Sequence, residues 1–255
     1  MLDMHSHILY GLDDGPNTKT EAVAIIQRAA GEQITDIIAT SHAFHPNFHA
    51  HAAAVREQLK ELAAELAREE IPVRLHAGQE IRLNDVLTER ITEGEALTLA
   101  GSKYVLLELP SNSVPAYTIP VVQQLLAMNL IPIIAHPERN KAIAEKPNRL
   151  YRLIMNGALA QVTAGSLSGH FGKAIQKTSL QLIEANLIHT YGSDVHNLKT
   201  RPSLFNEGLD FLEKRKKHEI VDILLENNER ILRNEDMIQL EPEEIRPGKW
   251  WQVLK

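Results

Sequence analysis

The chain has 255 residues, of which 44% are hydrophobic, and this is enough to bury one large core or two small ones. Its formal net charge is −6, which argues against a dominant nucleic-acid-binding face. It has no cysteine, and this excludes disulfide bonds, cysteine-ligated zinc and any phosphatase that works through a thiol nucleophile.

The N-terminal residues lack the features of a secretory signal peptide. They carry Asp3, His5 and His7, and they have neither a basic region nor an apolar region. No apolar run reaches the roughly 18 residues that a membrane-spanning helix needs. We therefore expect a cytoplasmic protein with no membrane insertion and no nucleic-acid partner. The one basic run, at residues 214–217, is interpreted as a solvated helix end.

Strand-like and helix-like segments alternate along the chain. The pattern predicts apolar strands near residues 2–8, 34–41, 73–80, 103–109, 131–136, 159–163 and 187–193. It predicts helices near residues 19–31, 51–69, 117–128, 148–156, 172–185, 203–213 and 218–233. Strands that are apolar on both faces are typical of a parallel sheet covered by helices. The repeated units predict an α/β fold, and specifically a distorted (β/α)7 barrel of the TIM-like type.

The predicted elements are not divided by any low-complexity linker. We therefore expect a single domain over residues 1–255, with a C-terminal tail from about residue 236. The tail contains Trp250 and Trp251, which we expect to pack on the body of the protein. A role of this pair in binding a partner is the alternative.

Histidines and carboxylates recur where the predicted strands end. The first strand ends in His5-Ser6-His7, and the last is followed by Asp194-Val195-His196. Residues two apart on a strand point the same way, so His5 and His7 can bind one ion. In a barrel, the C-terminal ends of all strands meet at one mouth. The residues at these ends are His5, His7, His42, Glu80, Glu108, His136, Asp194 and His196. This set predicts a site for several divalent cations and hence metal-assisted hydrolysis.

Two carboxylates, Glu80 and Glu108, lie in apolar strands, where an ionised group is costly unless it is paired or bound to metal. The alternative to a metal is a salt bridge, and Arg82 is close enough in sequence to pair with Glu80. Further histidines follow His42 in a loop and at the start of a helix, and we interpret them as solvated loop residues: His45, His49 and His51.

Other polar residues lie on loops near the same strand ends. Asp13-Asp14-Gly15 is either a plain turn or the source of a further carboxylate for an ion. Arg139 and Arg201 follow predicted ligands by three and five residues. A guanidinium matches the oxygens of a phosphate, so at a metal site both are candidates to bind an anionic substrate. Surface salt bridges are the alternative. A serine hydrolase is disfavoured because the chain has no G-x-S-x-G motif.

Several of these segments together resemble a known family. The pattern D-x-H-x-H-x-L-x-x-x-D-D-G at residues 3–15 resembles the start of the PHP (polymerase and histidinol phosphatase) superfamily. The segments at residues 38–42, 78–82, 134–140, 165–167 and 193–197 narrow the resemblance. They are similar to the manganese-dependent protein-tyrosine phosphatases of Gram-positive capsule and exopolysaccharide loci. The resemblance extends from residue 1 to about residue 235.

The resemblance implies a distorted β/α barrel with three divalent metal ions at its mouth, manganese being expected and iron or zinc being alternatives. The ligands that it implies are His5, His7, Asp14, His42, Glu80, Glu108, His136, Asp194 and His196. The expected division places His5, His7, Glu80 and Asp194 on one ion. Glu80 then bridges to a second ion with Glu108 and His136, and Asp14, His42 and His196 bind the third. Arg139 and Arg201 would bind the phosphate.

The implied activity is hydrolysis of phosphotyrosine on a bacterial tyrosine autokinase that controls polysaccharide export. The alternatives are another PHP phosphoesterase acting on histidinol phosphate or nucleotides, an amidohydrolase-type barrel, and a non-catalytic metal-stabilised regulator. An amidohydrolase usually needs a carboxylated lysine on a middle strand, where this chain has Glu80 and Glu108. One departure from the family is Ser41-His42-Ala43, where proline usually precedes the histidine. We expect the loop after His42 to differ in shape from the corresponding loop of the family.

Overall fold

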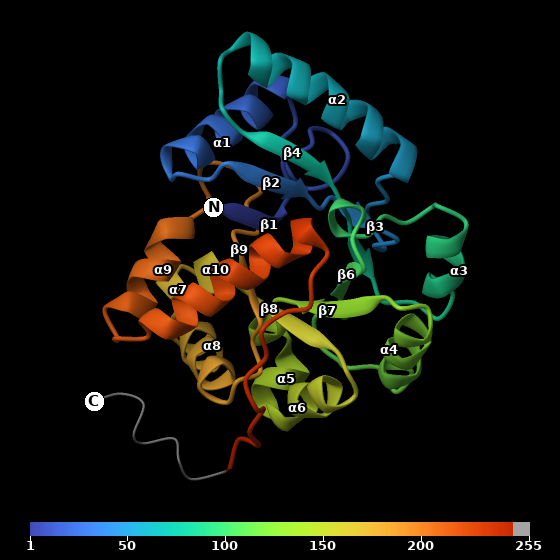
Figure 1. Ribbon diagram of the computed structural model, residues 1–255, viewed down its shortest axis with the longest axis vertical. Helices are drawn as coiled ribbons and strands as arrows, with labels where there is room; N and C mark the ends of the chain where they lie inside the picture. Colours follow the sequence, from blue (N-terminus) through green and yellow to red (C-terminus); the bar gives the residue numbers. More distant parts are fainter. Residues whose placement is uncertain (247–255) are drawn as a thin grey trace.

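Parallel strands connected through helices form the body of the protein (Figure 1). The computed structural model describes residues 1–246, so the expected packing of Trp250 and Trp251 lies outside the described residues. The strands are β1 (Leu2–Ser6), β2 (Asp36–Ala39), β3 (His42–Ala43), β4 (Arg74–Ala77), β5 (Glu80–Arg82), β6 (Tyr104–Glu108), β7 (Ile131–Ala135), β8 (Leu159–Thr163) and β9 (Thr190–Gly192). The longer helices are α1 (Lys19–Gly31), α2 (Ala52–Arg68), α4 (Thr118–Ala127), α6 (Asn148–Met155), α8 (Lys173–Glu184), α9 (Phe205–Glu213) and α10 (His218–Arg233).

Short helical segments that the sequence pattern did not predict lie mostly in the connections between strands. They are α3 (Leu87–Thr92), α5 (Lys141–Glu145), α7 (Ala164–Ser168) and the 3-10 helices η1 (Leu99–Gly101) and η2 (Pro137–Arg139). Each has six residues or fewer, which is too short to show a helical repeat in the sequence. The predicted longer helices are confirmed to within two residues at either end.

The strands form two sheets, one in the order β1-β2-β4 and one in the order β3-β5-β6-β7-β8-β9. Every pairing in both sheets is parallel. The predicted strands over residues 34–41 and 73–80 are confirmed in part: β2 and β4 lie within these ranges but end at Ala39 and Ala77, and the separate short strands β3 and β5 that follow were not predicted. β2 pairs with β1 and β4, whereas its continuation β3 pairs with β5 in the other sheet.

The interruptions fall at two residue pairs, Thr40-Ser41 and Gly78-Gln79. Thr40 joins the two sheets, since its N–H donates to Ser6 O (2.8 Å) and its carbonyl accepts from Glu80 N (3.0 Å). A Cβ at Gly78 would lie 2.7 Å from Cγ2 of Ile38, so only glycine permits this close approach of the two chain segments. The shift between sheets places the first residues of β3 and β5 toward the site described below.

The larger sheet ends at β9, and the segment that follows β9 contacts β1. Ser6 forms an isolated parallel bridge with Val195, which follows β9. Two backbone hydrogen bonds support it, from Asp194 N to His5 O (2.8 Å) and from His7 N to Val195 O (2.9 Å). The chain therefore has a mixed α/β fold with a curled parallel sheet, in which the N-terminal strand lies beside a segment that is distant in the sequence.

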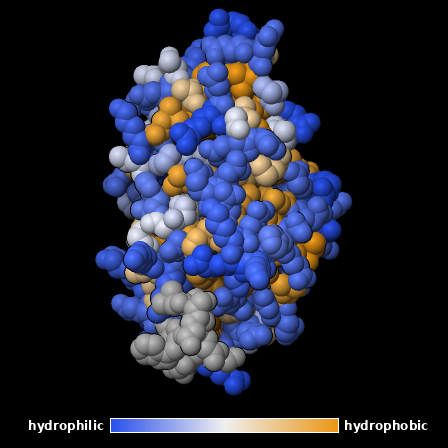
Figure 2. All heavy atoms as spheres, turned by 90° about the vertical axis from the view of Figure 1, so that its left-hand side faces the viewer, coloured by the Kyte–Doolittle hydropathy of each residue, from blue (hydrophilic) through white to orange (hydrophobic). Residues whose placement is uncertain are grey.

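Helices cover the outside of the curled sheet (Figure 1). The clearest predicted helix, α2, buries Val55, Leu59, Leu62 and Leu66, which recur every three or four residues on one face. Helix α1 begins with Thr18 as its N-cap, whose side chain accepts a hydrogen bond from the backbone N–H of Glu21 (3.2 Å). The surface in Figure 2 is mostly hydrophilic with small scattered apolar areas. Among the described helices, none is long and apolar enough to cross a membrane.

The described part of the C-terminal tail, residues 235–246, runs along the body without forming a helix (Figure 1). The Asn227 side chain holds it by donating to Ile238 O (2.9 Å) and accepting from Ile238 N (2.7 Å). Further along, Asn148 makes the same pair of bonds with the backbone of Ile245, at 3.2 and 2.8 Å. Side-chain amides thus replace the strand or helix partners that this segment lacks.

Candidate metal centre

The predicted metal ligands converge on one place although they are spread over the sequence. His5 lies in β1, His42 and Glu80 begin β3 and β5, and Glu108 ends β6. The others lie on the segments just after β1, β7 and β9. Ligand atoms within 4.8 Å of one another form four overlapping groups: His7, Asp14, His42 and His196; His5, His7 and Glu80; His5, His136 and Asp194; and His42, Glu80 and Glu108. Every predicted ligand belongs to at least one group.

The grouping differs in part from the expected division among three ions. His136 was expected with Glu108, but it groups with His5 and Asp194. Glu108 groups with Glu80 and with His42, whose Nδ1 lies 3.9 Å from Glu108 Oε2. Since the groups share members, the side chains form one continuous cluster of donors.

The Glu80 carboxylate is at the centre of the cluster. Its Oε1 lies 2.7 Å from Nε2 of His136, and its Oε2 lies 3.1 Å from Nδ1 of His42 and 3.3 Å from Nε2 of His7. Burial would raise the pKa of Glu80, but the surrounding histidines hold this pKa well below its usual value. Glu80 is therefore a buried, ionised carboxylate whose charge faces imidazoles. Arg82, considered above as its partner, pairs with Glu108 instead (3.1 Å).

Several buried ligand atoms in the cluster form no hydrogen bond, although some of them face a charged group of the same cluster. Nine buried side-chain nitrogen and oxygen atoms in the described part lack one, and five of these belong to predicted ligands. The five are Nδ1 of His42, Oε2 of Glu80, Oε2 of Glu108, Oδ1 of Asp194 and Nε2 of His196. An unpaired buried polar atom is costly, so such a concentration needs a compensating partner. Mixed imidazole and carboxylate donors fit divalent cations such as Mn, Fe or Zn.

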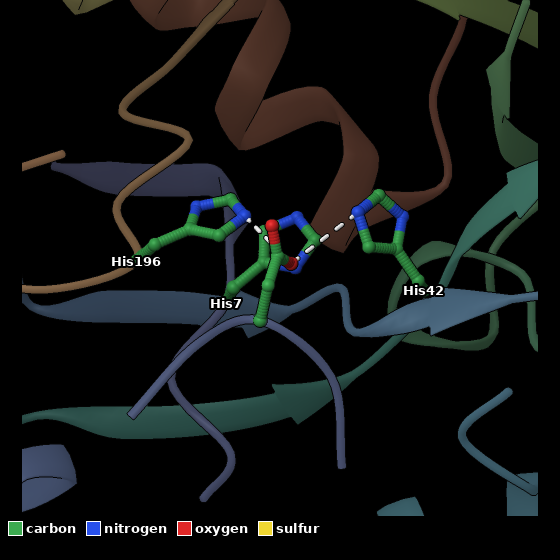
Figure 3. A group of neighbouring side chains, drawn as sticks. His7, His42 and His196 are labelled. Carbon is green, nitrogen blue, oxygen red and sulfur yellow. Dashed lines mark ion pairs between the residues drawn. The ribbon is translucent and has the colours of Figure 1, made fainter. Parts of the chain in front are cut away.

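One edge of the cluster is open to solvent at Asp14. Figure 3 shows His42 and His196 pointing at one carboxylate, with His7 behind it, and Asp14 Oδ1 lies 3.5 Å from Nε2 of His42 and 3.1 Å from Nε2 of His196. The rings of His7 and His196 stack with centroids 3.9 Å apart. The Asp14 side chain is 37% exposed, whereas that of His196 is 1% exposed. A substrate can therefore approach from the Asp14 side.

Both predicted arginines lie at this open edge. Arg139, in η2, and Arg201, on the loop after β9, pair with Oδ2 of Asp194, the latter at 3.0 Å. Arg201 also reaches Asp14 Oδ2 (3.1 Å). Burial opposes ionisation of Asp194, but the two guanidinium groups hold its pKa well below the usual value. Oδ1 of Asp194 is left facing His5 Nε2 (3.3 Å), on the side of the donor cluster.

Two polar residues orient the ligands: Asp13, which the sequence offered only as part of a turn or as a carboxylate for an ion, and Gln161, which was missed as a functional candidate. Asp13 Oδ2 lies 2.7 Å from Nδ1 of His7 and accepts from the backbone N–H of His42 (3.0 Å). Gln161 Oε1 lies 3.1 Å from Nδ1 of His5. Each contact fixes the ring and leaves its other nitrogen toward the cluster. Gln161 could have been noticed in the sequence, because it places a polar amide within the apolar strand β8.

Glu138 was likewise missed, and it supports the turn that carries His136 and Arg139. His136 has a positive φ of 33°, after which the chain enters η2. Oε1 of Glu138 accepts from the backbone N–H and the hydroxyl of Thr163, at 3.1 and 2.9 Å. The turn is thereby attached to the end of the neighbouring strand. The loop histidines are placed differently: His49 and His51 are exposed, and His45 is partly buried against His42.

The family model described as "Capsular polysaccharide synthesis, CpsB/CapC" matches residues 1–233. The chain belongs to the CpsB/CapC family. It is 38% identical over 255 residues to CapC of Staphylococcus aureus, covering all of both chains. It is 40% identical over 249 residues to the tyrosine-protein phosphatase YwqE of Bacillus subtilis, covering 98% of each chain.

A solved structure of this CpsB/CapC group also matches. It comes from crystal structures described as "YwqE from Bacillus subtilis and CpsB from Streptococcus pneumoniae, unique metal-dependent tyrosine phosphatases". The match has a TM-score of 0.94 and 40% identity, and it covers 97% of this chain and 100% of the other. A lactonase from Listeria monocytogenes, 10% identical with a TM-score of 0.58, shares the fold alone.

Proposed function

We propose that this member of the CpsB/CapC family is a metal-dependent protein-tyrosine phosphatase. The observation that carries the proposal is the convergence of imidazoles and carboxylates, five of their buried atoms without a hydrogen-bond partner, beside two arginines at a solvent-accessible edge. Relatives that match nearly the whole chain are named tyrosine-protein phosphatases, and the matched crystal structures are described as metal-dependent. The capsule link rests on the family description.

The proposed metal ligands are the nine clustered residues: His5, His7, Asp14, His42, Glu80, Glu108, His136, Asp194 and His196. We propose three ions, with manganese as the metal in use. Divalent cations at such a centre lower the pKa of water and offset phosphate charge. Glu80 belongs to two groups, so its two oxygens suit a bridging role. Asp13 and Gln161 hold the His7 and His5 rings in orientation.

Arg139 and Arg201 bind the phosphate group in this proposal. Their guanidinium groups already meet at Asp194, and each side chain is about one quarter exposed, at 25% and 27%. Hydrogen-bond donors remain on both for phosphate oxygens, because a guanidinium has five N–H groups. Positive charge fixed at this edge would stabilise the charge that develops during in-line displacement. Tyrosinate is a good leaving group for a phosphate ester, because the pKa of a phenol is about 10.

The proposed substrate is a phosphotyrosine-bearing protein, specifically a bacterial tyrosine autokinase that controls capsule or exopolysaccharide synthesis. We also propose that the two sheets and the Ser6–Val195 bridge together make a closed, distorted barrel of the PHP type. The returning backbone bonds between β1 and the segment after β9 support this. The single-domain organisation over the whole chain, and a cytoplasmic location, belong to the same proposal.

A substrate comparison tests the proposed reaction. Manganese-loaded protein is assayed with a phosphotyrosine peptide, a phosphoserine peptide of the same sequence, and histidinol phosphate. The proposal predicts that the phosphotyrosine peptide gives the highest kcat/KM. A preference for histidinol phosphate would assign the protein to a metabolic reaction instead, and metal binding without hydrolysis of any of the three would favour a regulator.

A further inference from the structure

The loop after His42 carries two rings that continue the metal centre outward. We infer that His45 and Phe48 form an aryl wall that packs against the phenyl ring of the substrate tyrosine and selects phosphotyrosine over alkyl phosphates. This inference rests on the proposed function, since it names the group that the same site recognises next to the phosphate.

The aryl wall is a set of nearly parallel rings built on a predicted ligand. The His42 and His45 rings have centroids 4.7 Å apart with an interplanar angle of 23°. The Phe48 ring lies 5.5 Å from His45 at 18° and 6.0 Å from His42 at 11°. These separations are those of offset-stacked aromatic pairs. A further flat ring can therefore join the array by the same kind of contact.

The wall lies next to where the phosphate would bind. The nitrogens of His42 face two carboxylates of the centre, with Nδ1 3.1 Å from Glu80 and Nε2 3.5 Å from Asp14. Figure 3 shows His42 directed at the same carboxylate as His196. In phosphotyrosine, the ring follows phosphorus after a single oxygen. A phosphate at the centre therefore brings the phenyl ring within reach of rings that contact His42.

Hydrogen bonds hold the wall in place. The loop closes through Ala50 N to His42 O (2.8 Å), and within it Phe48 N donates to His45 O (3.2 Å). The Gln79 side chain donates to the Ala50 carbonyl and so attaches the loop to the start of β5. His45 and Phe48 are each only partly buried, so ring surface remains available. A fixed, partly exposed aromatic surface loses little conformational entropy on binding a ring.

If the aryl wall binds the phenyl ring, the protein should bind a phosphonate that carries a phenyl ring more tightly than one that does not. An aromatic contact of this kind favours a phenyl ligand by about threefold to tenfold over one without a ring. We would measure the binding of benzylphosphonate and methylphosphonate to manganese-loaded protein by isothermal titration calorimetry. Both carry the same non-hydrolysable anionic group, and benzylphosphonate places a phenyl ring one atom from phosphorus. The wild type is expected to bind benzylphosphonate more tightly by that factor.

The variants separate the ring from the rest of the loop. Phe48→Ala and His45→Ala should bring the ratio of the two affinities toward one while the affinity for methylphosphonate stays within twofold. Phe48→Tyr keeps the ring and should keep the ratio. Phe211→Ala is the matched control, because Phe211 is also partly buried but lies in α9 against Arg215. It should change neither affinity. Circular dichroism and manganese content verify that each variant is folded and loaded.

Several results would overturn the inference. One is a wild type that binds both phosphonates equally, and another is an unchanged ratio in both alanine variants. Equal losses for both phosphonates would assign the loop to support of the metals. Hydrolysis of a phosphotyrosine peptide is measured in parallel: a benzyl preference without hydrolysis would support the wall and overturn the proposed reaction, whereas hydrolysis without that preference would overturn the wall alone.

Discussion

His136 follows strand β7, and its side chain reaches the centre of the cluster of candidate metal ligands. Its Nε2 lies 2.7 Å from Oε1 of Glu80, while its backbone N–H donates to Gln161 Oε1 (3.2 Å). The backbone bond does not depend on the imidazole, so removal of the ring leaves the turn attached to β8. The role of the side chain is thereby separable from its role in folding.

We predict that His136→Ala abolishes turnover and preserves the fold. Loss of a metal ligand should lower kcat on a phosphotyrosine peptide by about 100-fold or more, since the metals supply the nucleophile. Circular dichroism and the thermal midpoint in chelator should match those of the wild type. Turnover within threefold of the wild type would contradict the ligand role.

Asp13 holds the ring of His7 in orientation, so we predict that its replacement weakens metal binding. Asp13→Asn removes the charge beside Nδ1 of His7, and loss of such a supporting carboxylate lowers metal affinity by about 10–100-fold. Manganese affinity is measured by titration of the stripped protein. Asp85→Asn is the matched control, because Asp85 is exposed and outside the candidate metal groups. If both variants bind manganese as tightly as the wild type, Asp13 does not support the centre.

The interrupted strands matter at the scale of elements. β2 and β4 lie in one sheet, and their continuations β3 and β5 begin with His42 and Glu80 in the other. The interruption therefore aligns these two ligands directly, as His42 pairs in register with Glu80. An uninterrupted strand would not bring the chain across between the sheets at this point.

Gly78 is the residue that this arrangement requires. In Gly78→Ala, the new Cβ would lie 2.7 Å from Cγ2 of Ile38 and 3.2 Å from Cδ2 of Leu99, both inside the packed core. We expect the free energy of unfolding to fall by about 1–3 kcal/mol, as for other overpacked sites. Urea denaturation provides the measurement. Gly31→Ala, with no heavy atom within 4 Å of its Cβ, should be neutral or slightly stabilising. Equal stability of Gly78→Ala and wild type would refute the packing argument.

The sequence was sufficient to predict the longer helices, the parallel pairing of the strands and the convergence of the candidate ligands. Apolar runs and three-to-four-residue spacing carry that information, as in α2. The separate strands β3 and β5 were not predictable, because each has three residues or fewer and its pairing in the other sheet depends on tertiary packing. The salt bridge of Arg82 to Glu80, considered as the alternative to a metal, does not form, because Arg82 pairs with Glu108 of the adjacent strand β6.

Over the whole molecule, the centre connects segments that are distant in sequence. His5 Nε2 lies 3.3 Å from Asp194 Oδ1, so the N-terminal strand and the segment after β9 meet in one cluster. Ions bound there would stabilise the native state by mass action, because the unfolded chain has no assembled site. The free energy of unfolding should therefore increase with the concentration of metal. It should also depend on pH, through the protonation of buried groups away from the centre.

His189 is such a group, and it predicts a pH dependence of stability. It is 3% exposed, and burial lowers its pKa from the ordinary value of 6.5 to about 4. As pH falls from 6.5 toward 4, the unfolded chain takes up a proton that the folded chain does not, so stability is lost in that window. At pH 5 the loss is about 2 kcal/mol, since one pKa unit corresponds to about 1.4 kcal/mol.

Urea unfolding at pH 7 and pH 5, in chelator, measures this effect. His189→Asn keeps an acceptor near the backbone N–H of Ala160, which His189 Nδ1 accepts at 3.2 Å, but has no titrating ring. Its loss of stability between the two pH values should be smaller than that of the wild type. An identical loss in both proteins would show that His189 does not titrate in this window.

The most direct test is a manganese titration of the chelator-stripped protein, in which bound metal per chain and turnover of a phosphotyrosine peptide are measured in the same samples. We expect no turnover without metal, a rise in turnover as manganese binds, and saturation at three ions per chain. Full turnover in the presence of chelator, with no bound metal, would contradict this expectation.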